Sequence, residues 1–105
     1  MNQLINDFRL EAIKKWDFVF GKGGTTRTAK KNHKNLCKIF DEIKGKNMLD
    51  EFSVLLNDSE ESVVLEAGAL LLKEKYNGAA DALRRLTKNR GLISFTAKMS
   101  LQELS

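Results

Sequence analysis

The chain has 105 residues and a formal net charge of +4, with 42% of its residues hydrophobic and 30% charged. This length suits one modest core, and the composition is that of a globular chain, neither disordered nor membrane-like. No apolar run approaches the ~20 residues that a membrane-spanning helix needs. A single cysteine, Cys37, excludes an internal disulfide framework. We therefore expect one domain over residues 1–105 of a soluble, cytoplasmic protein that makes no membrane contact.

The first half of the chain shows apolar stripes at helical spacing, and no proline interrupts them. One stripe runs through residues 4–20 and ends at a run of glycines. A second stripe covers residues 29–43, and Gly45 is expected to end that helix. Asn47 is expected to cap a short third helix that reaches Leu56. The first half thus predicts three helices.

The second half predicts three further helices. Asp58 and Glu61 have the spacing of a capping box ahead of a helix over residues 63–76. That helix is apolar on nearly every side, so neighbours are expected to cover more than one of its faces. Two more stripes, over residues 79–88 and 93–104, are separated by a glycine turn. Three small residues would let a neighbouring helix approach closely: Ala67, Gly68 and Ala69.

About six helices joined by short loops imply an all-α fold of antiparallel hairpins stacked side by side. One segment of this array resembles a HEAT-type repeat, in which an acidic turn precedes a helix with a valine and a small residue at inward positions. The matching residues are Asp58, Val63 and Ala67. The basic residue that often follows the valine is replaced by Val64.

The C-terminal sequence ADALRRLTKNRGLISFTAKMSLQEL is similar to the ending of short HEAT-like bacterial domains of unknown function. The matching residues are Gly91, Phe95, Ala97, Met99 and Leu101. The sequence TAKKNHKNLCKIFDEIK is similar to their second helix, so the resemblance touches about two thirds of the chain. It implies a short HEAT-like α-solenoid and supplies no catalytic residue. Some small proteins of this general type act as immunity proteins, which bind and neutralise a toxin domain.

Charged residues are segregated along the chain. A basic segment without acidic residues holds Lys22, Arg27, Lys30, Lys31, Lys34 and Lys38. An acidic stretch without basic residues follows, and its candidate partner-binding patch comprises Asp50, Glu51, Asp58, Glu60 and Glu61. Patches of opposite sign can steer charged partners, although solvated helix faces are also charged without a binding role.

Three local features resemble functional sites but lack the partners that chemistry needs. His33 and Cys37 share a helix face, yet the chain has no second histidine or cysteine for zinc and no evident third group for a nucleophile. We expect both to pack on the apolar stripe.

The run at residues 21–24 lacks the glycine order of a phosphate loop, so we expect a plain helix connection. Phe18 lies off the core stripe and is a candidate interface aromatic, unless the end of its helix is sandwiched in the core.

These observations predict a binding module rather than an enzyme, with no catalytic residue, metal, cofactor or small-molecule substrate. The leading hypothesis is an immunity-type inhibitor that binds another protein, namely a basic, nuclease-type toxin domain, through the acidic patch. The alternative is a HEAT-like domain that binds nucleic acid through the basic segment. Affinity for nucleic acid would then fall steeply with salt.

Overall fold

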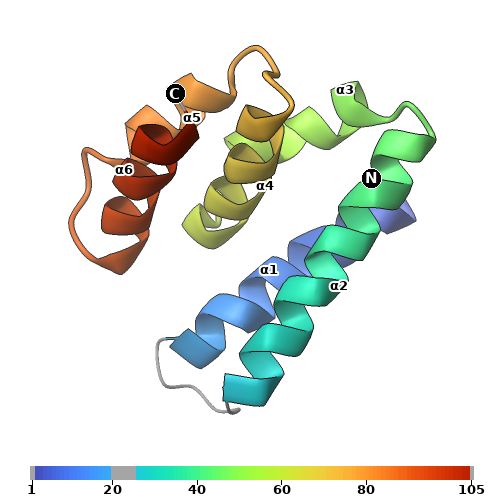
Figure 1. Ribbon diagram of the computed structural model, residues 1–105, viewed down its shortest axis with the longest axis horizontal. Helices are drawn as coiled ribbons and strands as arrows, with labels where there is room; N and C mark the ends of the chain where they lie inside the picture. Colours follow the sequence, from blue (N-terminus) through green and yellow to red (C-terminus); the bar gives the residue numbers. More distant parts are fainter. Residues whose placement is uncertain (1, 20–25, 105) are drawn as a thin grey trace. The chain divides into compact units, whose positions relative to one another are not determined.

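The structure is a computed structural model that describes residues 2–19 and 26–104. Within these ranges, the side chains of residues 18, 19, 26–29 and 104 are not described. Over these residues all regular secondary structure is helical (Figure 1). The elements are α1 (Gln3–Val19), α2 (Thr26–Gly45), α3 (Leu49–Phe52), the 3₁₀-helix η1 (Ser53–Asn57), α4 (Glu61–Lys73), α5 (Ala79–Leu86) and α6 (Leu92–Leu104). The predicted all-α fold class, with six α-helices in the described residues, is confirmed.

The chain divides into two compact units, residues 1–52 and residues 53–105. Unit 1 contains α1 to α3, and unit 2 contains η1 and α4 to α6. The boundary falls within the segment for which the sequence predicts one short helix. That prediction is wrong in one respect, because the α-helix ends at Phe52 and continues as a 3₁₀-helix from Ser53. Phe52 is buried in unit 1, whereas Leu55 and Leu56 are buried in the η1 segment of unit 2.

Unit 1 is an antiparallel hairpin of α1 and α2 (Figure 1). The predicted stripes form its core, where the buried side chains are Ile5, Phe8, Ala12, Trp16, Leu36, Phe40 and Ile43. Phe52 of α3 joins this core. Its ring meets Phe8 edge-on at a centroid distance of 4.8 Å, and it lies 5.3 Å from the ring of Phe40. Three aromatic rings from three helices therefore hold unit 1 together.

The end of α2 differs from the sequence prediction. Asn47 adopts the left-handed conformation, with φ of 57°. Its N–H donates to the carbonyl of Lys44, and the N–H of Met48 donates to the carbonyl of Ile43. This is the Schellman pattern, in which a left-handed residue satisfies the last helical carbonyls. Asn47 therefore terminates α2 rather than capping α3, and Gly45 belongs to the helix. A short polar side chain tolerates this backbone conformation better than most others do.

Unit 2 is built around α4, and α4, α5 and α6 each contact the other two (Figure 1). As predicted, α4 is covered on several faces, and its buried residues are Ser62, Val63, Val64, Leu65, Ala67, Gly68 and Leu71. The predicted close approach also occurs. A Cβ atom added to Gly68 would lie 3.0 Å from Cδ2 of Leu83 on α5.

The predicted capping box at the start of α4 is wrong. The N-cap residue is Glu60, with φ of −90° and no side-chain hydrogen bond to the helix. The carboxylate of Asp58 instead accepts the backbone N–H of Glu60 at 2.9 Å. This local turn uses the Asp58 side chain before the helix begins, so that it does not cap the first helical turn.

Candidate protein-binding groove

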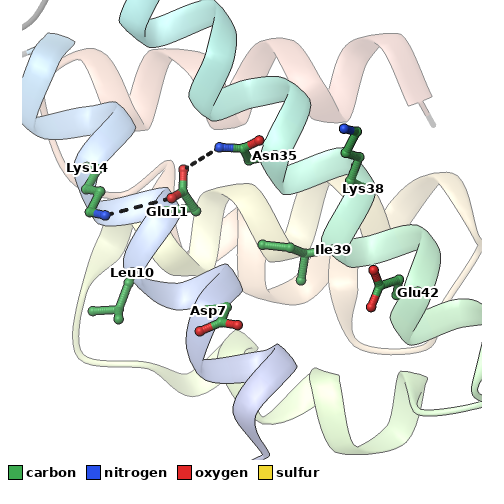
Figure 2. A pocket seen from close by; sticks show the side chains of 8 residues that line it. All are labelled: Asp7, Leu10, Glu11, Lys14, Asn35, Lys38, Ile39 and Glu42. Atoms are coloured by element: carbon green, nitrogen blue, oxygen red, sulfur yellow. Dashed lines mark hydrogen bonds and ion pairs between the residues drawn. The ribbon is translucent and has the colours of Figure 1, made fainter.

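A groove of about 370 Å³ runs between α1 and α2 of unit 1 (Figure 2). Each helix lines it with residues at relative positions 0, 3, 4 and 7, which is one face of an α-helix. The lining residues are Asp7, Leu10, Glu11 and Lys14 from α1, and Asn35, Lys38, Ile39 and Glu42 from α2. Because the two helices run antiparallel, Asp7 of α1 and Glu42 of α2 lie toward the same end of the groove.

Polar contacts hold Glu11 in the middle of the groove. Its Oε2 accepts a hydrogen bond from Nδ2 of Asn35 at 3.4 Å, so this pair bridges the two helices (Figure 2). Its Oε1 lies 3.8 Å from Nζ of Lys14. Glu11 is therefore engaged in contacts within unit 1, and we assign it a positioning role rather than a role in binding a partner.

The other end of the groove combines negative charge with apolar surface. Glu42 is exposed, and Asp7 is half-buried and accepts a hydrogen bond from Nε2 of Gln3 at 2.7 Å. Leu10 is 45% exposed, and Ile39 points from α2 toward α1 (Figure 2). Two carboxylates beside exposed aliphatic carbon suit a long cationic side chain, whose stem packs on carbon while its head pairs with the acids.

The predicted acidic patch is divided between the two units. Asp50 and Glu51 are exposed on α3 of unit 1. In unit 2, Glu60 is exposed, while Asp58 is half-buried and is used in the turn before α4. Glu61 is exposed and accepts a hydrogen bond from the side-chain amide of Asn89.

In unit 2, the acidic residues of the patch lie beside the cationic side chain of Arg85. Asp58, Glu61 and Arg85 line one hollow of about 240 Å³. The Arg85 guanidinium donates to the carbonyl of Leu56 at 3.0 Å and to the side chain of Asn57 at 3.4 Å. A fixed arginine beside these two acids reduces the negative potential there. The α1–α2 groove also holds cations, since Lys14 and Lys38 line it beside three acids, and it differs from the hollow in its exposed Leu10.

The predicted basic segment is exposed where the structure describes it. Lys30, Lys31, Lys34 and Lys38 all lie on α2 with exposed side chains. Lys22 and the side chains of Arg27 and Phe18 lie outside the described residues. Nζ of Lys15 on α1 lies 3.3 Å from Nδ1 of His33 on α2, so α1 adds lysines to this end of the hairpin. The resulting set, named the lysine end, comprises Lys14, Lys15, Lys30, Lys31 and Lys34.

His33 does not occupy the core position that the sequence predicts for it. It is exposed, whereas the neighbouring Asn32 is buried with 8% exposure. The axis of the buried stripe, defined by Leu36 and Phe40, passes closer to Asn32 and leaves His33 at its edge. Nε2 of His33 lies 3.8 Å from Sγ of Cys37, which is half-buried. Among the described residues, no three histidine, cysteine or acidic side chains are grouped closely enough to hold a metal ion.

Sequence reasoning missed the groove, although a signal was present. Leu10 and Ile39 are apolar residues that fall outside the core stripes of their helices. Leu10 follows Asp7 by three positions, and Ile39 precedes Glu42 by three positions. Comparisons with protein-family models, with curated proteins and with solved structures each give no match to this chain. Where the structure describes the chain, no helix combines the length and apolar character needed to span a membrane.

Proposed function

We propose that this protein is a protein-binding module of the immunity type, which binds and neutralises a basic, nuclease-type toxin domain. The observation that carries the proposal is the acidic end of the α1–α2 groove, whose lining includes Asp7, Glu42 and the exposed Leu10. Exposed aliphatic surface supplies binding energy, and the carboxylates select a cationic partner.

The proposed mechanism is occlusion. A nuclease must present lysine or arginine side chains to the phosphates of its substrate, so its active surface is basic. A cation from that surface would enter the groove between Asp7 and Glu42, with its aliphatic stem against Leu10 and Ile39. Asp50 and Glu51 on α3 of the same unit would add to the attraction. The inhibitor then covers the surface that the nucleic acid needs, and no covalent step is required.

Charge reversal in the groove tests this proposal. Complexes that contain the untagged protein would be isolated from its source cells. The nuclease found in them would then be assayed for cleavage with and without added protein. We expect Asp7→Lys with Glu42→Lys to raise the dissociation constant by about 100-fold, because attraction becomes repulsion at the centre of the contact. Asp41→Lys is the matched control, since Asp41 is exposed on the same helix and does not line the groove.

The two parts of the acidic patch can be separated in the same assay. Asp50→Lys with Glu51→Lys is expected to weaken binding, whereas Glu60→Lys with Glu61→Lys is expected to leave it nearly unchanged. Equal inhibition by the wild type and the groove variant would refute the groove as the binding site. The immunity proposal itself fails if no nuclease is captured and the protein protects no cell from a toxin.

A second function is favoured by the lysine end of unit 1. Five lysines from two helices lie at one end of the hairpin, where Lys15 of α1 meets His33 of α2. Such a cluster suits phosphate groups on neighbouring nucleotides. Among the side chains that the structure describes, no exposed aromatic residue lies between these lysines, which favours duplex over single-strand binding. We propose nucleic-acid binding through this end as the alternative function.

The salt dependence of duplex binding tests this alternative. Fluorescence anisotropy with a labelled DNA duplex would be recorded between about 50 mM and about 200 mM salt. We expect Lys14→Glu with Lys34→Glu to weaken binding and to reduce the slope of log affinity against log salt by about 2, since two phosphate contacts are lost. Lys73→Glu, at an exposed position on α4, is the control. Wild-type protein that does not bind at the lowest salt concentration would exclude this function.

A further inference from the structure

Helix α6 has a buried side formed by small residues and an exposed side that carries large apolar residues. Ala97 and Ser94 are buried against the rest of unit 2, at 0% and 3% exposure. The other side is solvent-exposed although it is apolar, since Leu92 is 47% exposed, Phe95 58% and Met99 42%. Three such residues on one helix face form a continuous stripe, which soluble surfaces seldom present unless it meets a partner.

The stripe has the spacing of a coiled-coil seam. If Leu92 takes heptad position a, then Phe95 is at d and Met99 is at the next a. Gln102 follows at d and is also exposed. The residues that face the core of unit 2, such as Ser94 and Ala97, then occupy positions c and f, which lie on the outer side of a coiled coil. One face of α6 therefore serves the unit, and the opposite face has the pattern of a helix-pairing surface.

The charges beside the seam distinguish between possible arrangements. Lys98 takes position g and Glu103 the following position e, and both are exposed. In a parallel pair of helices, a residue at g lies beside the e residue of the next heptad on the other helix, five positions later. Two copies of α6 in parallel would therefore form two symmetrical Lys98–Glu103 pairs. An antiparallel pair would instead place Lys98 of one copy near Lys98 of the other, which is repulsive.

We propose that α6 is a dimerisation helix, which pairs in parallel with α6 of a second copy of this chain. A two-fold axis along the helix pair makes the interface isologous, so each apolar residue meets the same residue of the other copy. The buried centre would consist of Leu92, Phe95 and Met99, and the Lys98–Glu103 pairs would set the helix direction. The seam is only two heptads long, so the dimer dissociates on dilution. This surface is separate from the groove in unit 1, and the inference does not depend on the proposed function.

Sedimentation equilibrium tests the proposal, with concentrations from about 1 μM to about 1 mM. We expect a concentration-dependent dimer for the wild type and a monomer for Phe95→Glu, because the substitution would bury two carboxylates opposite each other. Val54→Glu is the matched control, since Val54 is 54% exposed in unit 2 but lies on η1. It should leave the dimer intact. Far-UV circular dichroism of each variant checks that the fold is retained.

A charge swap tests the parallel arrangement. Lys98→Glu should raise the dissociation constant of the dimer about tenfold, since each Lys98–Glu103 attraction becomes a repulsion. The double variant Lys98→Glu with Glu103→Lys should restore the dissociation constant of the wild-type dimer. A wild type that stays monomeric at every concentration would overturn the proposal, as would a dimer that survives Phe95→Glu. A double variant that remains as weak as the single one would overturn the parallel arrangement.

Discussion

Replacing Phe52 with alanine is expected to destabilise unit 1 by about 3–5 kcal/mol, which is the usual cost of removing a buried phenylalanine. Phe52 has no exposed surface, and its ring contacts both Phe8 and Phe40. The edge-on contact with Phe8 is lost in addition to the buried area. Alanine would leave a cavity between three helices, and the hairpin cannot close it without moving α3.

Thermal and urea unfolding would measure this effect. The chain has one tryptophan, Trp16, which is buried in unit 1, so its fluorescence reports on that unit. Far-UV circular dichroism reports on the helices of both units. The single domain predicted from the sequence requires the two signals to change together, in the wild type and in the variant. Val54→Ala is the control, because Val54 is 54% exposed and its truncation should change the free energy of unfolding by less than about 0.5 kcal/mol. Equal effects of the two substitutions would contradict the assignment of Phe52 to the core.

Replacing Gly68 with valine is expected to destabilise unit 2 by about 2–3 kcal/mol through overpacking. A Cβ atom at this position would lie 3.0 Å from Cδ2 and 3.1 Å from Cγ of Leu83. Leu83 is fully buried, so it has little room to move, and the two further methyl groups of valine enlarge the clash. The separation of α4 and α5 would have to increase.

A glycine in the other unit supplies the control for this substitution. Gly45 also lies in a helix, but a Cβ atom added there would have no neighbour within 4 Å. Gly45→Ala should therefore stabilise the protein by up to about 1 kcal/mol, because alanine has the higher helix propensity. Chemical denaturation gives both values. If Gly68→Val proved as harmless as Gly45→Ala, the close approach of α4 and α5 would be refuted.

Local patterns predicted much of the fold and little of the candidate site. The apolar stripe predicted over residues 79–88 corresponds to α5, which buries Ala82 and Leu83 and exposes Arg84. Stripe positions are reliable because the helical period depends on the chain alone. The helix ends were less predictable, because Asn47 and Asp58 make backbone contacts that compete with capping.

The groove could not be derived from either helix alone. Asp7 and Glu42 are 35 positions apart in the sequence, and only the pairing of α1 with α2 brings them to one groove. The acidic patch was predicted from the closeness of its members in the sequence. Closeness along the chain did not anticipate Arg85, which comes from α5 and lies in the same hollow as Asp58.

A 3.6-residue period within single segments was enough to predict an all-helical protein and most of its core residues. Contacts between helices were needed to show that Leu10 and Ile39 border a groove with acidic side chains, and that Phe95 and Met99 stay exposed while Ala97 is buried. The physical reason is the same in both cases. An apolar residue is buried or exposed according to whether another helix covers it, and the covering helix comes from a distant part of the chain.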